Sequence, residues 1–288
     1  MYHSLSKEPS PPQSSTRLDD EGDPGTARNI PLSSASLLER MRLKSDLEHA
    51  KKMLQFARQL TEKRPLLTSE VLVKYFNDSS PEAIRWFGEQ IKKIHAYMMY
   101  TSVKRNFQIT KSDSIGARYL AKVEKNDISQ SLRNYIESQQ RLADDHDGKE
   151  LAALRREKKN DYRGQINDKF ITINMNFYGK VGGADERAVN LIHEFSHAAL
   201  NTYDYVYAGR DFSDPKFRSL KSPDQSAIFR LGRGKLLSMD EEKQQRTLGD
   251  HATLHDLFNA TADQQSAFAK RNADSLAYAI QAAYLAQK

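Results

Sequence analysis

Two histidines and a glutamate stand at a spacing that suits metal chemistry, in the run His193-Glu194-Phe195-Ser196-His197. On an α-helix, residues four positions apart lie about 40° apart around the axis, so both imidazoles aim at one point. Zn²⁺ accepts paired imidazoles of this kind. Glu194 is close enough to act on a water held by the metal rather than on the metal itself. The run therefore predicts one zinc ion per chain, with His193 and His197 as ligands and Glu194 as general base.

The surrounding sequence predicts the helix that this spacing needs, over Asp185–Leu200. Gly182 and Gly183 interrupt the chain before it, and the acidic residues that open it are favourable near the positive end of the helix dipole. Apolar or small residues cover so much of its circumference that the helix should be buried. The alternative is a chance match, but two buried histidines and a glutamate without a ligand would each need a polar partner.

The elements that position this helix are predicted to be mostly helical. Apolar residues recur at steps of three and four in Ser36–Leu60 and Glu82–Tyr100, and a shorter helix over Thr68–Phe76 is expected to be capped by Thr68 or Ser69. Phe170–Phe177 alternates apolar and polar residues and is predicted to be a strand beside the zinc helix. The expected fold class is α+β, mainly helical, with a small antiparallel sheet next to the zinc helix.

Composition divides the 288-residue chain into three parts. Residues 1–35 are rich in Ser, Pro, Asp and Gly and are predicted to be a disordered tail. This tail is either a simple disordered segment or an unstructured export signal, and composition leaves both open. Residues 36–66 form a helical extension, and residues 67–288 form the catalytic domain.

The net charge and the amino-acid composition argue against several classes of function. The net charge of +6 is spread along the chain, so it indicates solubility rather than a nucleic-acid site, and no nucleic-acid-binding module is recognisable. No apolar run approaches the length of a membrane span. The chain has no cysteine, which excludes disulfides and cysteine zinc ligands and is typical of a reducing compartment. A monomer that acts on a protein or peptide is expected.

Two further motifs resemble those of one protease family. The run from Asn201 to Ala208 resembles the Gly-Thr-x-Asp-x-x-Tyr-Gly signature of the aspzincins, the deuterolysin and peptidyl-Lys metalloendopeptidase family. The run Asn272–Ser275 resembles the Asn-Ala-Asp-Ser helix of that family, and Trp86-Phe87-Gly88 stands in a corresponding early helix. The resemblance implies a zincin-like metalloprotease fold over roughly residues 71–288.

The resemblance makes Asp204 the third zinc ligand, beside His193 and His197, and makes Tyr207 the hydroxyl donor to the oxyanion. Three protein ligands leave the fourth zinc position open, and a phenol near a developing oxyanion donates a hydrogen bond in the transition state. The residues alone leave alternatives open, in which Asp204 is a loop carboxylate and Tyr207 a packing aromatic.

Asp274 has two candidate roles. The resemblance implies substrate binding, because lysine-preferring members use this aspartate and a glutamate three positions later to hold a substrate lysine. Ala277 stands at that later position here, so a loose preference for a basic or polar residue is expected. Alternatively Asp274 is itself the third zinc ligand and Asp204 is structural.

The chain also departs from the family. Asn201 and Ala208 replace both signature glycines, and residues 210–262 are interpreted as an insertion. A second histidine pair, His251 and His255, lacks the glutamate and is interpreted as a partly exposed helix start. The fungal members are disulfide-bonded, so the cysteine-free chain is expected to be a bacterial protein.

The leading hypothesis is therefore a zinc metalloendopeptidase, a secreted bacterial effector or toxin that a bacterial secretion system delivers into the cytoplasm of a target cell. The alternative from another class is a catalytically degenerate zincin that binds a protein without cleaving it. An intact Glu194 argues against that alternative, because a protein that only binds gains nothing from a general base.

Overall fold

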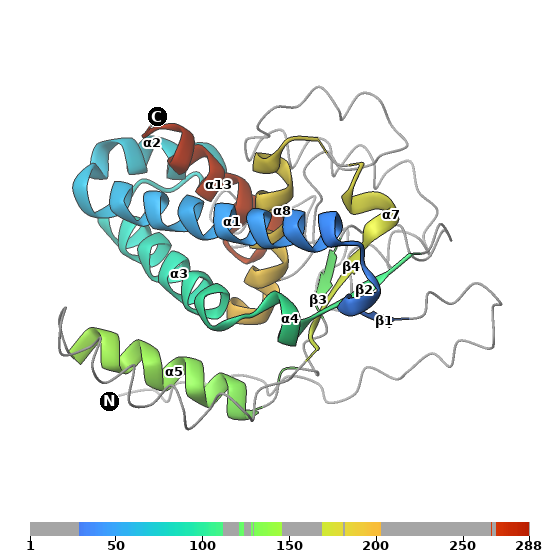
Figure 1. Ribbon diagram of the computed structural model, residues 1–288. Helices are drawn as coiled ribbons and strands as arrows, with labels where there is room; N and C mark the ends of the chain where they lie inside the picture. The colour runs from blue at the N-terminus through green and yellow to red at the C-terminus, as the bar shows by residue number, and fades with distance from the viewer. Residues whose placement is uncertain are drawn as a thin grey trace, which may run out of the picture.

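The computed structural model describes residues 29–111, 121–123, 128, 130–145, 169–180, 182–202, 266 and 269–287. Helices dominate this part of the chain, and a small sheet lies at one end of them (Figure 1). The longer helices are α1 (Leu37–Lys63), α2 (Pro65–Phe76), α3 (Pro81–Tyr100), α5 (Gln130–Asp145), α8 (Ala184–Leu200) and α13 (Ala273–Leu285). The short ones are η1 (Leu32–Ser34), α4 (Val103–Asn106) and α7 (Met175–Tyr178).

Local capping explains where the first helices begin. Ser36 and Glu39 form a capping box at the start of α1, with Ser36 N donating to Glu39 Oε2 at 2.7 Å and Glu39 N donating to Ser36 Oγ at 3.2 Å. Ser80 caps α3 by accepting from the backbone N–H of Ala83 at 3.0 Å. These starts confirm two of the predicted helices. The cap predicted for α2 is wrong, because α2 already begins at Pro65, whose fixed φ suits a first helical position.

The sheet has the strand order β1-β2-β4-β3 and is mixed. Its strands are β1 (Ile30–Pro31), β2 (Phe107–Thr110), β3 (Ala121–Val123) and β4 (Ile171–Asn174). Both edge strands pair antiparallel with their neighbours, but the central pair, β2 and β4, is parallel. The predicted antiparallel sheet is therefore corrected to a mixed one. The long connection between β2 and β4 allows a parallel return that a tight hairpin would not.

The strand that precedes α8 is shorter than predicted. Strand β4 ends at Asn174, and the rest of the predicted Phe170–Phe177 strand becomes the helical turn α7. Asn174 Oδ1 accepts from the backbone N–H of Asn176 at 3.2 Å, which caps that turn. The polar face expected for the strand is also buried, and Thr172 Oγ1 there accepts from Gln108 Nε2 at 2.9 Å.

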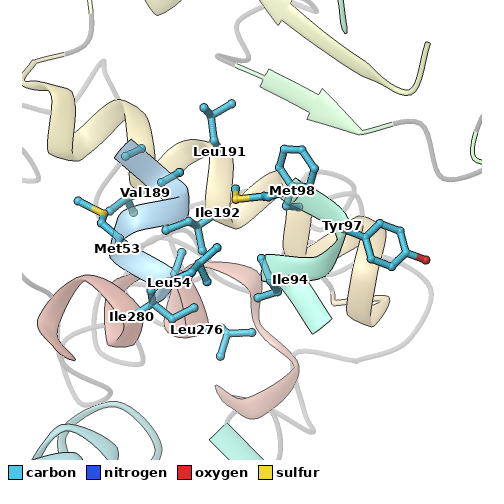
Figure 2. Close-up of a cluster of buried hydrophobic side chains, with 14 of the residues drawn as sticks. Met53, Leu54, Ile94, Tyr97, Met98, Val189, Leu191, Ile192, Leu276 and Ile280 are labelled. Atoms are coloured by element: carbon cyan, nitrogen blue, oxygen red, sulfur yellow. The ribbon is translucent and has the colours of Figure 1, made fainter. Parts of the chain in front are cut away.

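Helix α8 lies at the centre of the core. Figure 2 shows its Val189, Leu191 and Ile192 among buried side chains from three other helices. These side chains are Met53 and Leu54 of α1, Ile94, Tyr97 and Met98 of α3, and Leu276 and Ile280 of α13. The sequence analysis predicts that α1 belongs to an extension outside the domain that carries α8, but α1 packs in the same core as α8.

Aromatic rings join α8 to the sheet. The ring of Phe195 lies 6.4 Å from that of Phe107 in β2 and 6.3 Å from that of Phe170, just before β4, measured between centroids. All three side chains are fully buried. Because Phe195 lies between the two histidines in sequence, this packing fixes the histidine-bearing segment of α8 against the sheet.

A buried ion pair also joins α1 to α8. Asp46 accepts from Arg187 Nε at 2.8 Å and from the hydroxyl of Tyr178 at 3.1 Å. The Asp46 side chain is 2% exposed, so the guanidinium and the phenol supply the polar partners that burial removes. Burial raises the pKa of Tyr178, and the neighbouring Asp46 carboxylate raises it further. The hydrogen bond to Asp46 raises the pKa of Arg187. Both side chains therefore stay protonated as donors.

Several predictions fall partly or wholly outside the described residues. Residues 1–28 of the predicted tail and the interpreted insertion at 210–262 both lie outside them. Within the predicted tail, Ile30 and Pro31 pair with β2, so the structured part starts before residue 36. Among the helices that the structure describes, none has the length and apolar character needed to cross a membrane.

Candidate metal centre

The two predicted histidine ligands face each other on α8. The Nε2 atoms of His193 and His197 lie 3.2 Å apart, and the ring centroids lie 4.8 Å apart with the rings nearly perpendicular. Both histidines are buried, at 5% and 9% exposure. The helical spacing thus brings two imidazole nitrogens to one point, as the sequence predicts.

The Nδ1 atom of each imidazole ring also has a buried partner. His193 Nδ1 lies 2.5 Å from Asp274 Oδ1, and Asp274 is 1% exposed in the first turn of α13. His197 Nδ1 lies 2.8 Å from the backbone carbonyl oxygen of Thr202. A carboxylate and a carbonyl can only accept, so each Nδ1 carries the proton. When both rings are neutral, both Nε2 atoms hold lone pairs.

Two lone pairs that face each other at 3.2 Å repel unless something positive lies between them. Two nitrogens bound to one tetrahedral zinc at about 2.0–2.1 Å lie roughly 3.3 Å apart. The separation of the two Nε2 atoms is therefore that of adjacent zinc ligands. The outer hydrogen bonds from Nδ1 to a carboxylate and a carbonyl are those that metal-binding histidines usually make. These residues fit zinc.

Glu194 lies on the Nε2 side of this pair. Its Oε1 is 4.0 Å from His193 Nε2, and its side chain is 12% exposed. A carboxylate at this distance is too far to hydrogen-bond with His193 Nε2 but can reach a small molecule bound beside the two nitrogens. Glu194 therefore lies beside the two Nε2 atoms, a position compatible with its predicted role as general base.

The turn after α8 supplies one of the two outer partners. Asn201 adopts a left-handed conformation, with φ at 58°, and ends the helix. The chain then folds back, so that Thr202 O meets His197 while Thr202 Oγ1 lies 2.7 Å from Ser196 Oγ. Asparagine tolerates this backbone conformation, which explains how the chain turns here although the signature glycine is absent.

Sequence reasoning missed the roles of Thr202 and Asp274 as partners of the two imidazoles. The sequence distance between His193 and Asp274 is 81 residues, so no local periodicity connects them. The predicted substrate-binding role of Asp274 stays a prediction. The available signal was the polar Asn272–Ser275 run at the start of an otherwise apolar helix, which is unusual for a buried first turn.

The remaining predicted site residues lie outside the part of the chain that the structure describes. These are Asp204, Tyr207 and the second histidine pair, His251 and His255. Within the described residues alone, no group of three or more histidine, cysteine, aspartate and glutamate side chains forms a metal site. The described part of the centre thus consists of His193 and His197, the nearby Glu194, and the partners of the two rings.

Comparisons of the chain with protein-family models, with curated proteins and with solved structures found no match.

Proposed function

We propose that this chain is a zinc-dependent endopeptidase in which His193, His197 and Asp204 hold the metal and Glu194 is the general base. The observation that carries the proposal is the pair of Nε2 atoms 3.2 Å apart, each ring having its Nδ1 at hydrogen-bond distance from a buried acceptor. In a histidine pair with a purely structural role, two Nε2 lone pairs that face each other contribute no stabilisation. In a metal centre, both lone pairs are needed to bind the ion.

The residues around the pair have distinct tasks in peptide hydrolysis. A zinc ion held by His193, His197 and Asp204 would supply Lewis-acid chemistry and would lower the pKa of a bound water molecule toward about 7. Glu194 takes a proton from the attacking water and delivers it to the leaving amine. The resemblance to aspzincins supports Asp204 as third ligand and Tyr207 as a hydrogen-bond donor to the oxyanion.

We further propose that the protease is a bacterial effector or toxin that is secreted and delivered into a target cell. The absence of cysteine supports a reducing working compartment, and the Ser- and Pro-rich N-terminal composition is compatible with an unstructured export signal. The substrate is a protein or peptide of that cell.

The proposal is tested by mapping new protein termini in a proteome incubated with the zinc-loaded chain. Wild-type protein should generate a defined set of termini, and Glu194→Gln should lower their rate of appearance by roughly 10²–10⁴-fold. Zinc content should stay unchanged, because Glu194 acts on water rather than on the metal. Glu186→Gln is the matched control, since Glu186 is an exposed acidic residue in the first turn of the same helix.

The same experiment separates the protease from a zincin that only binds its target. A binding protein would retain zinc and a partner but give no new termini with wild-type protein. Near-normal cleavage by Glu194→Gln would instead show that another group is the base.

A further inference from the structure

A basic cavity lies on the opposite side of α1 from the contacts with α8. It occupies about 750 Å³ between the N-terminal half of α1, the η1 turn and the connection from α3 through α4 to β2. Figure 1 shows how this end of α1 passes α4 and β1. The residues of α1 that line the cavity recur at helical spacing and include Arg40, Lys44 and Lys51.

The charged side chains around this cavity are mostly of one sign. Among the described residues that line it, five are basic (Arg40, Lys44, Lys51, Lys104 and Lys169) and one, Glu48, is acidic. Lys51 Nζ pairs with Glu48 Oε1 at 2.8 Å, which neutralises both. Arg40, Lys44 and Lys104 form no ion pair with another described residue. The cavity therefore gathers positive charge that the described part of the chain does not balance.

Lys169, which precedes β4, adds a further positive charge to the lining of the cavity. Its ammonium donates to the backbone carbonyl of Lys104 at 2.7 Å, which holds the charge at the cavity but does not neutralise it. Partial burial lowers the pKa of Lys169. A bound anion would raise this pKa again, because an opposite charge nearby favours the ammonium form of the lysine.

The floor of the cavity is apolar. Leu32 and Leu47 are almost completely buried beneath it, and Val103 is half-buried at its side. A ligand that matches both surfaces carries an anionic group for the rim and a ring or other apolar body for the floor. Arginine and lysine together are the side chains that most often bind phosphate.

We infer that this cavity binds an organic phosphate with more than one negative charge, its phosphates on the Arg40, Lys44, Lys104 and Lys169 side chains and its organic body over Val103. This inference is independent of the proposed protease activity, because the described residues that line the cavity include none of the described residues of the candidate metal centre. A bound ligand joins α1 to the α3–β2 connection and should raise the thermal stability of the whole chain.

Calorimetric titration of the full chain at about 0.15 M salt tests this inference, since weak surface attraction is screened there. The probes are adenosine triphosphate and pyrophosphate. Both should bind at one site per chain, and adenosine triphosphate should bind more tightly because its organic body covers the floor. The double variant Arg40→Gln/Lys44→Gln should weaken both probes by roughly tenfold or more. Val103→Ser should weaken adenosine triphosphate alone.

The matched control is Lys74→Gln/Lys93→Gln, which removes the same charge from exposed positions on α2 and α3, away from the cavity. Equal affinities for this control and the Arg40/Lys44 variant would overturn the inference, because the binding would then reflect net charge alone. Absence of saturable binding to the wild-type chain would overturn it as well.

A second arm separates a soluble ligand from a lipid headgroup with the same phosphate chemistry. Vesicles that contain a phosphatidylinositol bisphosphate should retain the wild-type chain if the source is a lipid, and adenosine triphosphate should then compete. If the source is soluble, the vesicles retain no protein while adenosine triphosphate still binds. Retention that persists unchanged in the Arg40/Lys44 variant would count against this cavity.

Discussion

At the scale of single residues, the proposed metal centre depends on atoms that would not touch the metal. His193 is oriented by Asp274 at 2.5 Å and His197 by the Thr202 carbonyl at 2.8 Å. Without these acceptors each imidazole could rotate or place its proton on Nε2, where it would block a ligand position. The two acceptors thereby fix both the tautomer and the direction of the rings.

Asp274→Asn tests this orienting role, because asparagine keeps the shape of the side chain but removes its charge. We expect the affinity for zinc to fall by roughly 10–100-fold, the usual effect of removing an outer partner of a histidine ligand. Competition with a chromophoric chelator measures that affinity. The melting temperature of the metal-free variant controls for a general loss of stability.

The result also separates Asp274 from the substrate-binding role. If Asp274 only contacts substrate, the asparagine variant will keep its zinc affinity and change the residue preferred after the scissile bond. An unchanged zinc affinity would therefore contradict the orienting role.

At the scale of elements, α8 is held from two sides. Phe195 packs on the sheet, while Arg187 reaches back to Asp46 of α1. The ion pair matters because one partner is almost completely buried, and a buried carboxylate without its cation is costly. Helix α1 therefore stabilises the histidine-bearing helix although it contributes no residue to the centre.

Asp46→Ala should lower the free energy of unfolding by about 3–5 kcal/mol, since it leaves Arg187 and Tyr178 without their shared acceptor. Urea denaturation monitored by circular dichroism measures the change. Glu48→Ala is the control, because Glu48 is exposed and its pair with Lys51 on the same helix should contribute less than about 1 kcal/mol. Equal losses in the two variants would refute the tethering role of Asp46.

The elements also show what the sequence can predict. Helices α1, α3 and α8 follow from apolar periodicity and local caps such as Ser36 and Ser80, which act within four residues. The sequence does not predict the end of β4, because the alternation of apolar and polar residues continues through the helical turn that Asn174 caps. The parallel pairing of β2 with β4 and the contact between His193 and Asp274 join distant segments, and no local pattern encodes them.

At the scale of the whole molecule, one histidine should make the fold sensitive to acid. Burial lowers the pKa of His95 in α3, and together with the nearby positive charges of Arg58 and Lys51 it brings that pKa from 6.5 to about 4. The unfolded chain takes up this proton near pH 6.5, but the folded chain does so only near pH 4. The stability is therefore complete above pH 6.5 and is lost as the pH falls toward 4.

His95→Gln should reduce this acid sensitivity. Between pH 7 and pH 5 the wild-type chain should lose roughly 1–2 kcal/mol more stability than the variant. Urea denaturation at the two pH values measures the difference. A parallel pH dependence in the two proteins would show that His95 is not the group responsible.

The zinc content of the purified chain tests the central claim most directly. We propose that the paired Nε2 atoms of His193 and His197, 3.2 Å apart, hold a cation, and the donor set suits zinc. Elemental analysis of protein purified without chelators should find one zinc per wild-type chain and much less in His193→Ala. A chain that contains no zinc, and whose melting temperature does not rise when zinc is added, would contradict the account.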